Sequence, residues 1–430
     1  MKNLLKAIKP VSKINARIRL PGSKSITHRA LMMAALCEAP SEVRNPLRAE
    51  DTLITARALE SLGTAIEWGG DSVRIVPPAF RWRQPDGPVF LGNSGTSARL
   101  LIALVSSGTG TFVLDGTPRL RQRPMGAAAK ALERLGARMR WPGREGFAPV
   151  EIRGTGLSGG DVFVDASESS QFLSGILLAS PTARGTVRVE WSEPAASWPY
   201  VAITLEMMKE AGIRFERQAS NRISIPAPQV YAPCNITVEG DCSSASYFWA
   251  AAALTGGEVM TSPVSPHSLQ GDCRFLDVLH RMGCHIAWEN EGVRVIGPTR
   301  LLPIDIDMNE MPDMVPTLGV LSAFADGTTR IRNVGRLRIK ESDRLKAMAA
   351  GLTALGFNVE ELPDELTVHG GAPLGTPAGP VLSFDDHRIA MAFALAGLRL
   401  DGVVIEGAES VSKSFPEFWE IFEELGKNQL

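Results

Sequence analysis

One sequence pattern recurs six times along the chain at intervals of about 73 residues, and this repeat constrains the fold more than any other feature. Each copy is a helical run that ends in Leu-Gly, Met-Gly or Ala-Gly. The glycines are Gly63, Gly136, Gly212, Gly283, Gly356 and Gly426, with gaps of 73, 76, 71, 73 and 70 residues. Glycine suits the position after a helix because the left-handed backbone conformation costs it little. Alternating residues follow, such as Ile66, Trp68, Val73 and Ile75, and predict a half-buried hairpin.

A second series has the same period. Six segments begin with small or polar residues and continue as nearly all-apolar helices. They are KSITHRALMMAAL from Lys24, NSGTSARLLIALV from Asn93, SSQFLSGILLA from Ser169, DCSSASYFWAAAAL from Asp241, DMVPTLGVLSAF from Asp313 and DHRIAMAFALAG from Asp386. A helix that is apolar on every side is buried. We therefore predict an α/β protein of six β-α-β-α-β-β units. The last copy of the helix-Gly pattern, FEELGKNQL, is truncated.

A Pro-rich stretch, PAPQVYAPCNITVEGD from Pro226 to Asp241, separates the first three units from the last three. The sequence therefore predicts two similar domains of three units each, with buried helices that run parallel. Helix-Gly-strand phrases also occur in unrelated α/β proteins. Here, however, two independent series keep one spacing, which favours a true repeat.

Composition excludes several classes of protein. The chain has 430 residues, of which 44% are hydrophobic and 21% charged, enough for two or three domains and too apolar for disorder. The formal net charge of −2 argues against a nucleic-acid partner. We expect no membrane segment and no signal peptide. The five cysteines (Cys37, Cys234, Cys242, Cys273 and Cys284) lack CxxC spacing, so we expect reduced thiols in a cytoplasm, and neither a disulfide framework nor a metal site.

The predicted helices in the first half of the chain begin with polar and charged residues that a hydrophobic core does not require. They are Lys24, Ser25 and Arg29 in PGSKSITHR, Gly95 in GNSGTSAR, Arg119, Arg121 and Arg123 in DGTPRLRQRPM, Ser169, Ser170 and Gln171 in SESSQF, and Ser197 and Tyr200 in SWPY. Cations at a helix N-terminus oppose the helix dipole, and a bound anion removes that conflict. Arginine also pairs naturally with carboxylate or phosphate. Taken singly, each feature also fits a solvated basic pair, a turn or a helix cap.

The second half repeats this pattern. Its residues are Asp313 in MPDMVP, Lys340, Glu341 and Arg344 in RIKESDR, Asp386, His387 and Arg388 in DDHR, and Lys413 in SKSFPEF. We predict that Lys340 and Arg344 are neighbours on one helical turn, which is unfavourable unless an anion lies between them. Asp313 could equally cap a helix, and His387 could be structural. If the buried helices run parallel, these starts face a cleft for small phosphorylated or carboxylated substrates, with Asp313 and Glu341 as proton carriers.

Seven motifs in order, PGSKSITHRALMMAAL, LGNSGTSARLL, DGTPRLRQRPM, SSQFLSGILLASP, IKESDRL, DDHRIAMAFALA and KSFPEFW, resemble the 5-enolpyruvylshikimate-3-phosphate synthase family of enolpyruvyl transferases. The resemblance implies two inside-out α/β domains, residues 1–21 plus 240–430 and an inserted 22–239, with the active site in the cleft between them. It implies transfer of the enolpyruvyl group of phosphoenolpyruvate to the 5-hydroxyl of shikimate 3-phosphate, on the way to chorismate and the aromatic amino acids. It also implies a cytoplasmic monomer without cofactor or metal that glyphosate inhibits.

The same resemblance implies roles for single residues. Shikimate 3-phosphate would be bound by Lys24, Ser25, Arg29, Ser169, Ser170, Gln171, Ser197, Tyr200, Asp313, Arg336 and Lys340. Phosphoenolpyruvate would be bound by Lys24, Gly95, Arg123, Gln171, Arg344, Arg388 and Lys413. Asp313 would accept the proton of the attacking hydroxyl, Glu341 would protonate the methylene carbon, and Lys24 would assist.

Three positions depart from the family pattern. Arg336 stands where many relatives have Asn, Leu100 where Pro is frequent, and Trp198 where a basic residue is common. Two other functions remain open. The sister family that acts on UDP-N-acetylglucosamine usually carries a Cys in the loop that corresponds to TPRLRQRPM, which has none here. A non-catalytic anion-binding scaffold would be expected to have lost its proton carriers.

Overall fold

The computed structural model describes residues 4–79 and 82–426. The chain divides into two compact units. The terminal unit comprises residues 1–23 and 239–430, and the inserted unit comprises residues 24–238. The predicted boundaries, after residues 21 and 239, lie within two residues of these.

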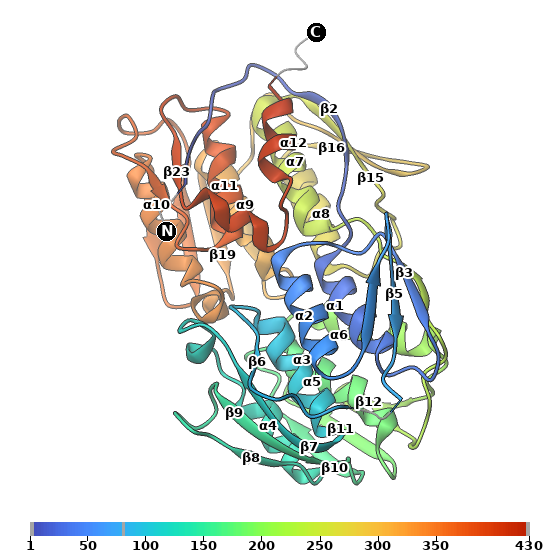
Figure 1. The fold of residues 1–430 in the computed structure, drawn as a ribbon. Helices are drawn as coiled ribbons and strands as arrows, with labels where there is room; N and C mark the ends of the chain where they lie inside the picture. The colour runs from blue at the N-terminus through green and yellow to red at the C-terminus, as the bar shows by residue number, and fades with distance from the viewer. Residues whose placement is uncertain (1–3, 80–81, 427–430) are drawn as a thin grey trace. The chain divides into compact units, whose positions relative to one another are not determined.

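The inserted unit contains three four-stranded sheets with one topology (Figure 1). Their strands are β3 (Ser41–Arg44), β4 (Ala65–Trp68), β5 (Ser72–Val76) and β14 (Asn235–Thr237); β6 (Val89–Phe90), β7 (Thr109–Asp115), β8 (Arg138–Arg140) and β9 (Val150–Thr155); and β10 (Gly160–Val164), β11 (Val187–Trp191), β12 (Glu216–Ala219) and β13 (Arg222–Ile225). The orders are β14-β3-β5-β4, β6-β7-β9-β8 and β10-β11-β13-β12. Each sheet joins one parallel pair to an antiparallel hairpin, which confirms the predicted hairpins.

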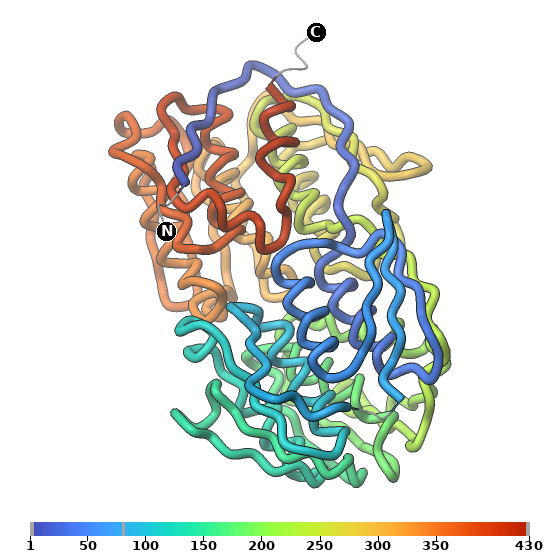
Figure 2. Tube along the Cα trace, viewed as in Figure 1, coloured from blue at the N-terminus to red at the C-terminus, as the bar shows by residue number. Residues whose placement is uncertain are grey.

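The terminal unit repeats this topology in two sheets and varies it in a third. The first two are β16-β17-β15-β2, from β2 (Asn15–Arg19), β15 (Glu258–Ser262), β16 (His285–Glu289) and β17 (Gly292–Ile296), and β18-β19-β21-β20, from β18 (Asp305–Asp307), β19 (Thr328–Arg332), β20 (Asn358–Glu361) and β21 (Glu365–His369). The third is β1-β23-β22, from β1 (Leu5–Ala7), β22 (Val381–Leu382) and β23 (Val404–Glu406). Here the N-terminal strand pairs antiparallel with β23 and takes the place of the hairpin, as Figure 2 shows where the blue and red segments run together.

Six nearly all-apolar helices form the cores, as predicted. They are α1 (Lys24–Ala34), α3 (Gly95–Ser106) and α5 (Ser170–Ala179) in the inserted unit, and α7 (Cys242–Thr255), α9 (Val315–Ala323) and α11 (His387–Gly397) in the terminal unit. Every residue of α7, α9 and α11 is buried. The α7 and α11 helices run parallel, because Arg388 contacts Ser243 near both starts and Arg399 donates to the Leu254 carbonyl near both ends. These buried helices inside outer sheets confirm the inside-out α/β fold.

The other helices carry the repeated glycines at their ends. They are α2 (Glu50–Ser61), α4 (Gly126–Arg134), α6 (Trp198–Glu210), α8 (Phe275–Arg281), α10 (Arg344–Ala354) and α12 (Phe418–Glu424). Positive φ angles occur at Gly63 (100°), Gly136 (102°), Gly212 (81°), Gly283 (103°) and Gly356 (89°). The glycine series is therefore confirmed as a series of helix ends. The last four residues of the truncated copy, 427–430, lie outside the described residues.

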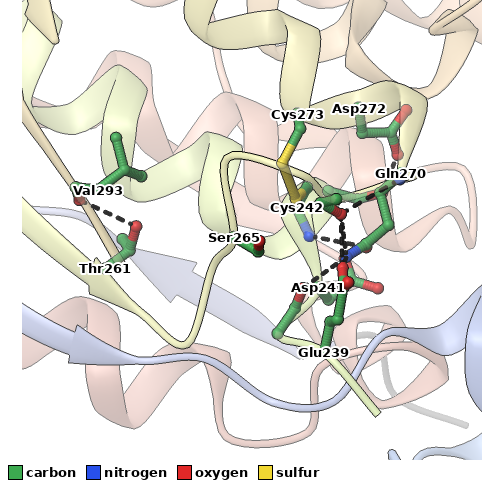
Figure 3. Close-up of a disulfide and its surroundings, with 12 residues drawn as sticks. Glu239, Asp241, Cys242, Thr261, Ser265, Gln270, Asp272, Cys273 and Val293 are labelled. Atoms are coloured by element: carbon green, nitrogen blue, oxygen red, sulfur yellow. Dashed lines mark hydrogen bonds between the residues drawn. A yellow bond between two sulfur atoms is a disulfide. The ribbon is translucent and has the colours of Figure 1, made fainter. Parts of the chain in front are cut away.

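The prediction that all cysteines are reduced is wrong. Cys242, at the start of α7, forms a disulfide with Cys273 in the short helix η3 (Gly271–Arg274), and Figure 3 shows this bond beside Asp272 and Gln270. The two cysteines are 31 residues apart, and only the return of η3 to the start of α7 brings them together. Cys37, Cys234 and Cys284 are buried free thiols.

Within residues 4–79 and 82–426, no helix has the length and apolar character needed to cross a membrane. Nor do His, Cys, Asp and Glu side chains in that part of the chain gather in groups of three that could hold a metal ion.

Candidate active site

In the terminal unit, the predicted site residues gather around Arg344, the first residue of α10. Asp343 caps this helix by accepting a hydrogen bond from the Lys346 backbone, and the Arg344 side chain is 1% exposed. Its guanidinium lies 2.8 Å from Asp313 Oδ1, 2.8 Å from Glu341 Oε2 and 2.8 Å from Asp386 Oδ2. One buried cation thus holds three carboxylates.

This geometry corrects one expectation. Lys340 and Arg344 are not neighbours on one helical turn, because α10 begins only at Arg344 and the Lys340 backbone is extended (φ −85°, ψ −154°). Asp343 is the N-cap residue, so the helix begins three residues after Glu341. The positive charge of Arg344 is balanced by carboxylates, whereas the sequence had suggested repulsion between two cations. The predicted apolar face of α10 is confirmed, since Leu345, Met348, Leu352 and Leu355 are all buried.

Asp313 lies between two arginines. It belongs to η4 (Pro312–Met314), directly before α9, and its Oδ1 contacts Arg344. Its Oδ2 lies 2.9 Å from Arg388 Nη2, and the Lys340 ammonium is 3.9 Å from Oδ1. The carboxylate therefore faces three positive groups, and the N-cap residues of η4 and α9 are Met311 and Met314, not Asp313.

The charges of this cluster are fixed by their surroundings. Burial lowers the pKa of Arg344, but the carboxylates of Asp386, Glu341 and Asp313 outweigh that effect and raise the pKa above its ordinary value. Asp386 itself is fully buried and caps α11 by accepting from the Arg388 backbone N–H at 3.0 Å. Arg344 is consequently a permanent cation.

Lys413 and Arg336 also belong to the terminal unit. Lys413 ends η6 (Ala408–Lys413) and is 5% exposed. Partial burial raises the pKa of Asp385, and the Lys413 ammonium counteracts that rise, which indicates that Lys413 lies near the start of α11. Arg336, in η5 (Gly335–Ile339), donates to the Asn309 side chain.

In the inserted unit, Arg29 is a buried cation among neutral partners. It lies on α1 and is 2% exposed. Its guanidinium donates to Thr204 Oγ1 at 2.7 Å, to Ser174 Oγ at 3.2 Å, and to the backbone carbonyls of Ser25 and Tyr200 at 3.0 Å each. Burial lowers its pKa to about 10, with the neighbouring Tyr200 acting in the opposite direction. Since all four acceptors are uncharged, this charge is one that an anion would stabilise.

Gly95 and Arg123 are in direct contact. A Cβ on Gly95 would collide with the guanidinium of Arg123, so only glycine lets this side chain lie against the start of α3. Arg123 is 3% exposed and donates to the Asn93 carbonyl at 3.3 Å. The other two arginines of the predicted cluster differ, because Arg121 pairs with Asp115 at the surface and Arg119 donates to Gln122.

Gln171 joins the starts of α3 and α5. Its Nε2 donates to Thr96 Oγ1 at 2.9 Å, and its Oε1 accepts from Arg99 Nη1 at 3.1 Å. Ser169 caps α5 by accepting from the Gln171 backbone, and its hydroxyl also lies 3.4 Å from Arg99 Nη1. The starts of these two helices are therefore one hydrogen-bonded group.

The remaining predicted residues surround these contacts. Lys24 lies 3.5 Å from Asp51 Oδ2 at the start of α2, and Ser170 is the first residue of α5. Ser197 precedes α6 in a left-handed conformation (φ 50°), which is uncommon for a residue with a side chain and is enriched at functional sites. Tyr200, on the first turn of α6, contributes the carbonyl that holds Arg29.

The sequence analysis missed two buried charges of the inserted unit, Arg99 and Asp51. Both are nearly inaccessible to solvent, at 3% and 2% exposure. A signal was present for Arg99, because it is a charged residue within the otherwise apolar run GTSARLLIALVS. Asp51 has no such signal, since its neighbours in the sequence resemble an ordinary acidic helix start.

Known proteins resemble this chain over nearly its whole length. The family model described as EPSP synthase (3-phosphoshikimate 1-carboxyvinyltransferase) matches residues 8–422. A 3-phosphoshikimate 1-carboxyvinyltransferase of Syntrophobacter fumaroxidans is 59% identical over 420 residues, covering 98% of this chain and 99% of the relative. A second one, of Vibrio vulnificus, is 41% identical over 418 residues, covering 96% of this chain and 97% of the relative.

A solved structure gives the same result. The structure of an EPSP synthase from Acinetobacter baumannii matches with a TM-score of 0.81 and 32% identity, covering 99% of this chain and 98% of the other. The fold, the family model and the relatives agree over nearly the whole length. The chain belongs to the EPSP synthase family, the 3-phosphoshikimate 1-carboxyvinyltransferases.

Proposed function

We propose that the side chains described in each unit bind the substrates and carry the protons of the family's reaction. The reaction is that of the family: the chain transfers the enolpyruvyl group of phosphoenolpyruvate to shikimate 3-phosphate in the shikimate pathway. The two substrates together carry about five negative charges near neutral pH, at up to ~2 per phosphate. They can approach each other only if cations neutralise both. The buried arginines of both units supply such cations.

The observation that most supports this function is the position of Asp313 and Glu341, which both contact the Arg344 guanidinium at 2.8 Å. We assign the proton of the attacking 5-hydroxyl to Asp313 and protonation of the methylene carbon to Glu341, with assistance from Lys24. Addition then gives a tetrahedral intermediate, which loses inorganic phosphate and one proton of the newly formed methyl group, so that the carbon–carbon double bond forms again. The arginine keeps the two carboxyl groups oriented, which general acid–base catalysis requires.

Phosphoenolpyruvate is assigned to the remaining cations. Its phosphate and carboxylate are bound by Lys24, Gly95, Arg123, Gln171, Arg344, Arg388 and Lys413. The contact between Gly95 and Arg123 supports this assignment, because it places a buried guanidinium at the N-terminal end of α3, and helix N-termini bind anions. Arg344 and Arg388 each contact one oxygen of Asp313, so a substrate anion competes with that carboxylate for them.

Shikimate 3-phosphate is assigned to the start of α1, the start of α5 and the first turn of α6. The residues are Lys24, Ser25, Arg29, Ser169, Ser170, Gln171, Ser197 and Tyr200, with Asp313, Arg336 and Lys340 from the terminal unit. Arg29 supports this assignment most strongly, because it is a buried charge with only neutral acceptors. The hydroxyl and amide groups of α5 suit the phosphate and the ring hydroxyls.

We extend the proposal to the inhibitor of the enzyme, its oligomeric state and its location in the cell. Glyphosate, a small molecule with phosphonate and carboxylate groups, inhibits the enzyme at the phosphoenolpyruvate subsite beside Gly95. The enzyme acts as a cytoplasmic monomer and uses no cofactor or metal. An inhibition curve that stays flat into the millimolar range contradicts the first proposal, and sedimentation as a dimer contradicts the monomeric state.

Phosphate release tests the function. The full chain is incubated with both substrates and with each one alone, and inorganic phosphate is measured over time. We expect release only when both are present. Release with UDP-N-acetylglucosamine in place of shikimate 3-phosphate identifies the sister reaction, and binding of both anions without release identifies a non-catalytic scaffold; either result overturns the proposal.

A further inference from the structure

Two neighbouring links connect the start of α7 to η3 in the terminal unit. Cys242 is bonded to Cys273, and the hydroxyl of Ser243, the next residue along α7, donates a hydrogen bond to Asp272 Oδ2. Figure 3 shows Asp272 and Cys273 above the start of α7, where Gln270 also accepts from the Cys242 backbone. These contacts hold η3 to the first turn of a fully buried helix.

Ser243 passes this contact on to Arg388. Its hydroxyl oxygen accepts a hydrogen bond from Arg388 Nη2 at 3.3 Å, and the same nitrogen lies 2.9 Å from Asp313 Oδ2. Because the Ser243 proton is directed to Asp272, the lone pairs of its oxygen face the guanidinium. Asp272 therefore determines which way this hydroxyl points.

We propose that Asp272 is a positioning residue that acts through Ser243 to hold Arg388 in the orientation that binds phosphoenolpyruvate. This inference rests on the proposed assignment of Arg388 to that substrate. Arg388 Nη2 is therefore held by two groups, Asp313 directly and the Ser243 hydroxyl that Asp272 orients. Without the hydrogen bond from Arg388 to Ser243, the guanidinium would move toward Asp313 and away from the substrate anion.

The environment of Asp272 fits a functional role better than a stabilising one. It is 3% exposed, and burial raises its pKa to about 6, with the charge of Asp313 adding to the rise and that of Arg388 and the Ser243 hydrogen bond opposing it. Asp241, at the N-terminus of α7, also raises it. A carboxylate that is costly to keep charged is usually retained for a purpose.

Steady-state kinetics of phosphate release test this role with four variants. Asp272→Asn replaces the charged acceptor with an amide, whose weaker acceptor oxygen and added N–H donor no longer fix the direction of the Ser243 hydroxyl. Ser243→Ala removes the link, and the double variant combines the two changes. Asp277→Asn makes the same substitution at an exposed position on the neighbouring helix α8 and is the matched control. Folding of each variant is checked by its unfolding transition.

We expect Asp272→Asn and Ser243→Ala each to raise the KM for phosphoenolpyruvate about tenfold, with kcat and the KM for shikimate 3-phosphate changed less than twofold. The double variant should be no worse than Ser243→Ala, because Asp272 acts through that hydroxyl. Asp277→Asn should match the unsubstituted chain. The proposal is overturned by an unchanged KM in Asp272→Asn, by additive effects in the double variant, or by a fall of kcat and both KM values in parallel with lost stability.

Failure of the proposed function has a different signature. If the unsubstituted chain releases no phosphate, the reaction itself is wrong. If Arg388→Ala leaves the KM for phosphoenolpyruvate unchanged, the assignment of Arg388 is wrong and the inference about Asp272 falls with it. If Arg388→Ala raises this KM and Asp272→Asn does not, only the positioning role is refuted.

Discussion

Arg344 and Asp386 form a two-point ion pair that solvent scarcely reaches. Nε of the arginine lies 2.8 Å from Oδ2 of the aspartate, Nη2 lies 3.2 Å from Oδ1, and the side chains are 1% and 0% exposed. Asp386 also caps α11, so it fixes both the direction of Arg344 and the start of a core helix.

Replacing Asp386 with Ala is expected to lower the free energy of unfolding by about 3–5 kcal/mol. Removal of one partner of a buried pair leaves the other charge poorly compensated, and α11 loses its cap. Urea unfolding measures the change. Asp385→Asn, at the exposed preceding residue, is the control and should stay within about 1 kcal/mol. Equal losses in the two variants would contradict the role given to this pair.

Gly95→Ala is expected to displace Arg123 and to weaken binding of phosphoenolpyruvate and glyphosate together. The new Cβ meets the guanidinium, which must move away from the start of α3. Loss of one charge-assisted contact predicts an increase of about 10- to 100-fold in the KM for phosphoenolpyruvate and in the inhibition constant of glyphosate. The KM for shikimate 3-phosphate should change little.

Gly70→Ala is the matched control for this substitution. Gly70 lies in the turn between β4 and β5, where a Cβ meets nothing within 4 Å. This variant should keep both constants. A Gly95→Ala enzyme with unchanged kinetics would remove Arg123 from the phosphoenolpyruvate subsite.

The central helices and hairpins could be predicted because their signals are local. Apolar runs such as α7 can only be buried, and glycines such as Gly63 and Gly283 mark helix ends by their backbone conformation. Pairings between distant segments could not be predicted in this way. The β14 strand joins β3 from the far end of the inserted unit, and β1 replaces a hairpin strand beside β23.

The same contrast between local and long-range signals applies to the candidate site. Its residue types were recognisable from motifs, but their partners depend on how distant segments meet. Nothing near Cys242 in the sequence indicates that Cys273 returns to it, or that Asp272 faces Ser243. The error at Lys340 was avoidable, because Asp343 is a favoured helix cap and predicts a helix that begins at Arg344.

Asp313→Ala and Glu341→Ala are each expected to lower kcat by at least ~10²-fold, the scale of general acid–base catalysis. Both variants also leave Arg344 with one carboxylate fewer. The expected loss is in turnover. In Asp313→Ala the KM for phosphoenolpyruvate should be unchanged or lower, since Asp313 no longer competes for Arg344 and Arg388. Rapid-quench measurement of a single turnover separates the chemical step from product release. Near-normal rates in both variants would refute the assigned proton carriers.

Asp272→Asn is expected to make the protein more stable at pH 7.5. The pKa of this carboxyl is raised to about 6, chiefly by burial, so the folded state holds its proton up to a higher pH than the unfolded state does. The free energy of unfolding therefore falls as pH rises from about 4 to 6, by up to about 3 kcal/mol in total. The asparagine variant avoids this loss.

Urea unfolding at several pH values checks the sign. The advantage of Asp272→Asn should be largest at pH 7.5 and should vanish as pH falls to about 4, where aspartic acid is neutral in both states. A variant that is less stable at pH 7.5 would show that the charge of Asp272 supports the fold. The combination of higher stability and weaker binding of phosphoenolpyruvate is what a positioning carboxylate predicts.

Reduction of the Cys242–Cys273 disulfide is expected to lower the free energy of unfolding by about 3–4 kcal/mol. The bond closes a segment of 31 residues, and the loss follows from the loop-closure entropy that the unfolded chain regains. Thermal unfolding with and without dithiothreitol measures it, and the Cys242→Ser, Cys273→Ser double variant is the control because it should not respond to the reductant. An equal response in both proteins would assign the effect to another thiol. If the bond also helps Asp272 to reach Ser243, reduction raises the KM for phosphoenolpyruvate, but by less than Ser243→Ala does, since the hydrogen bond itself remains.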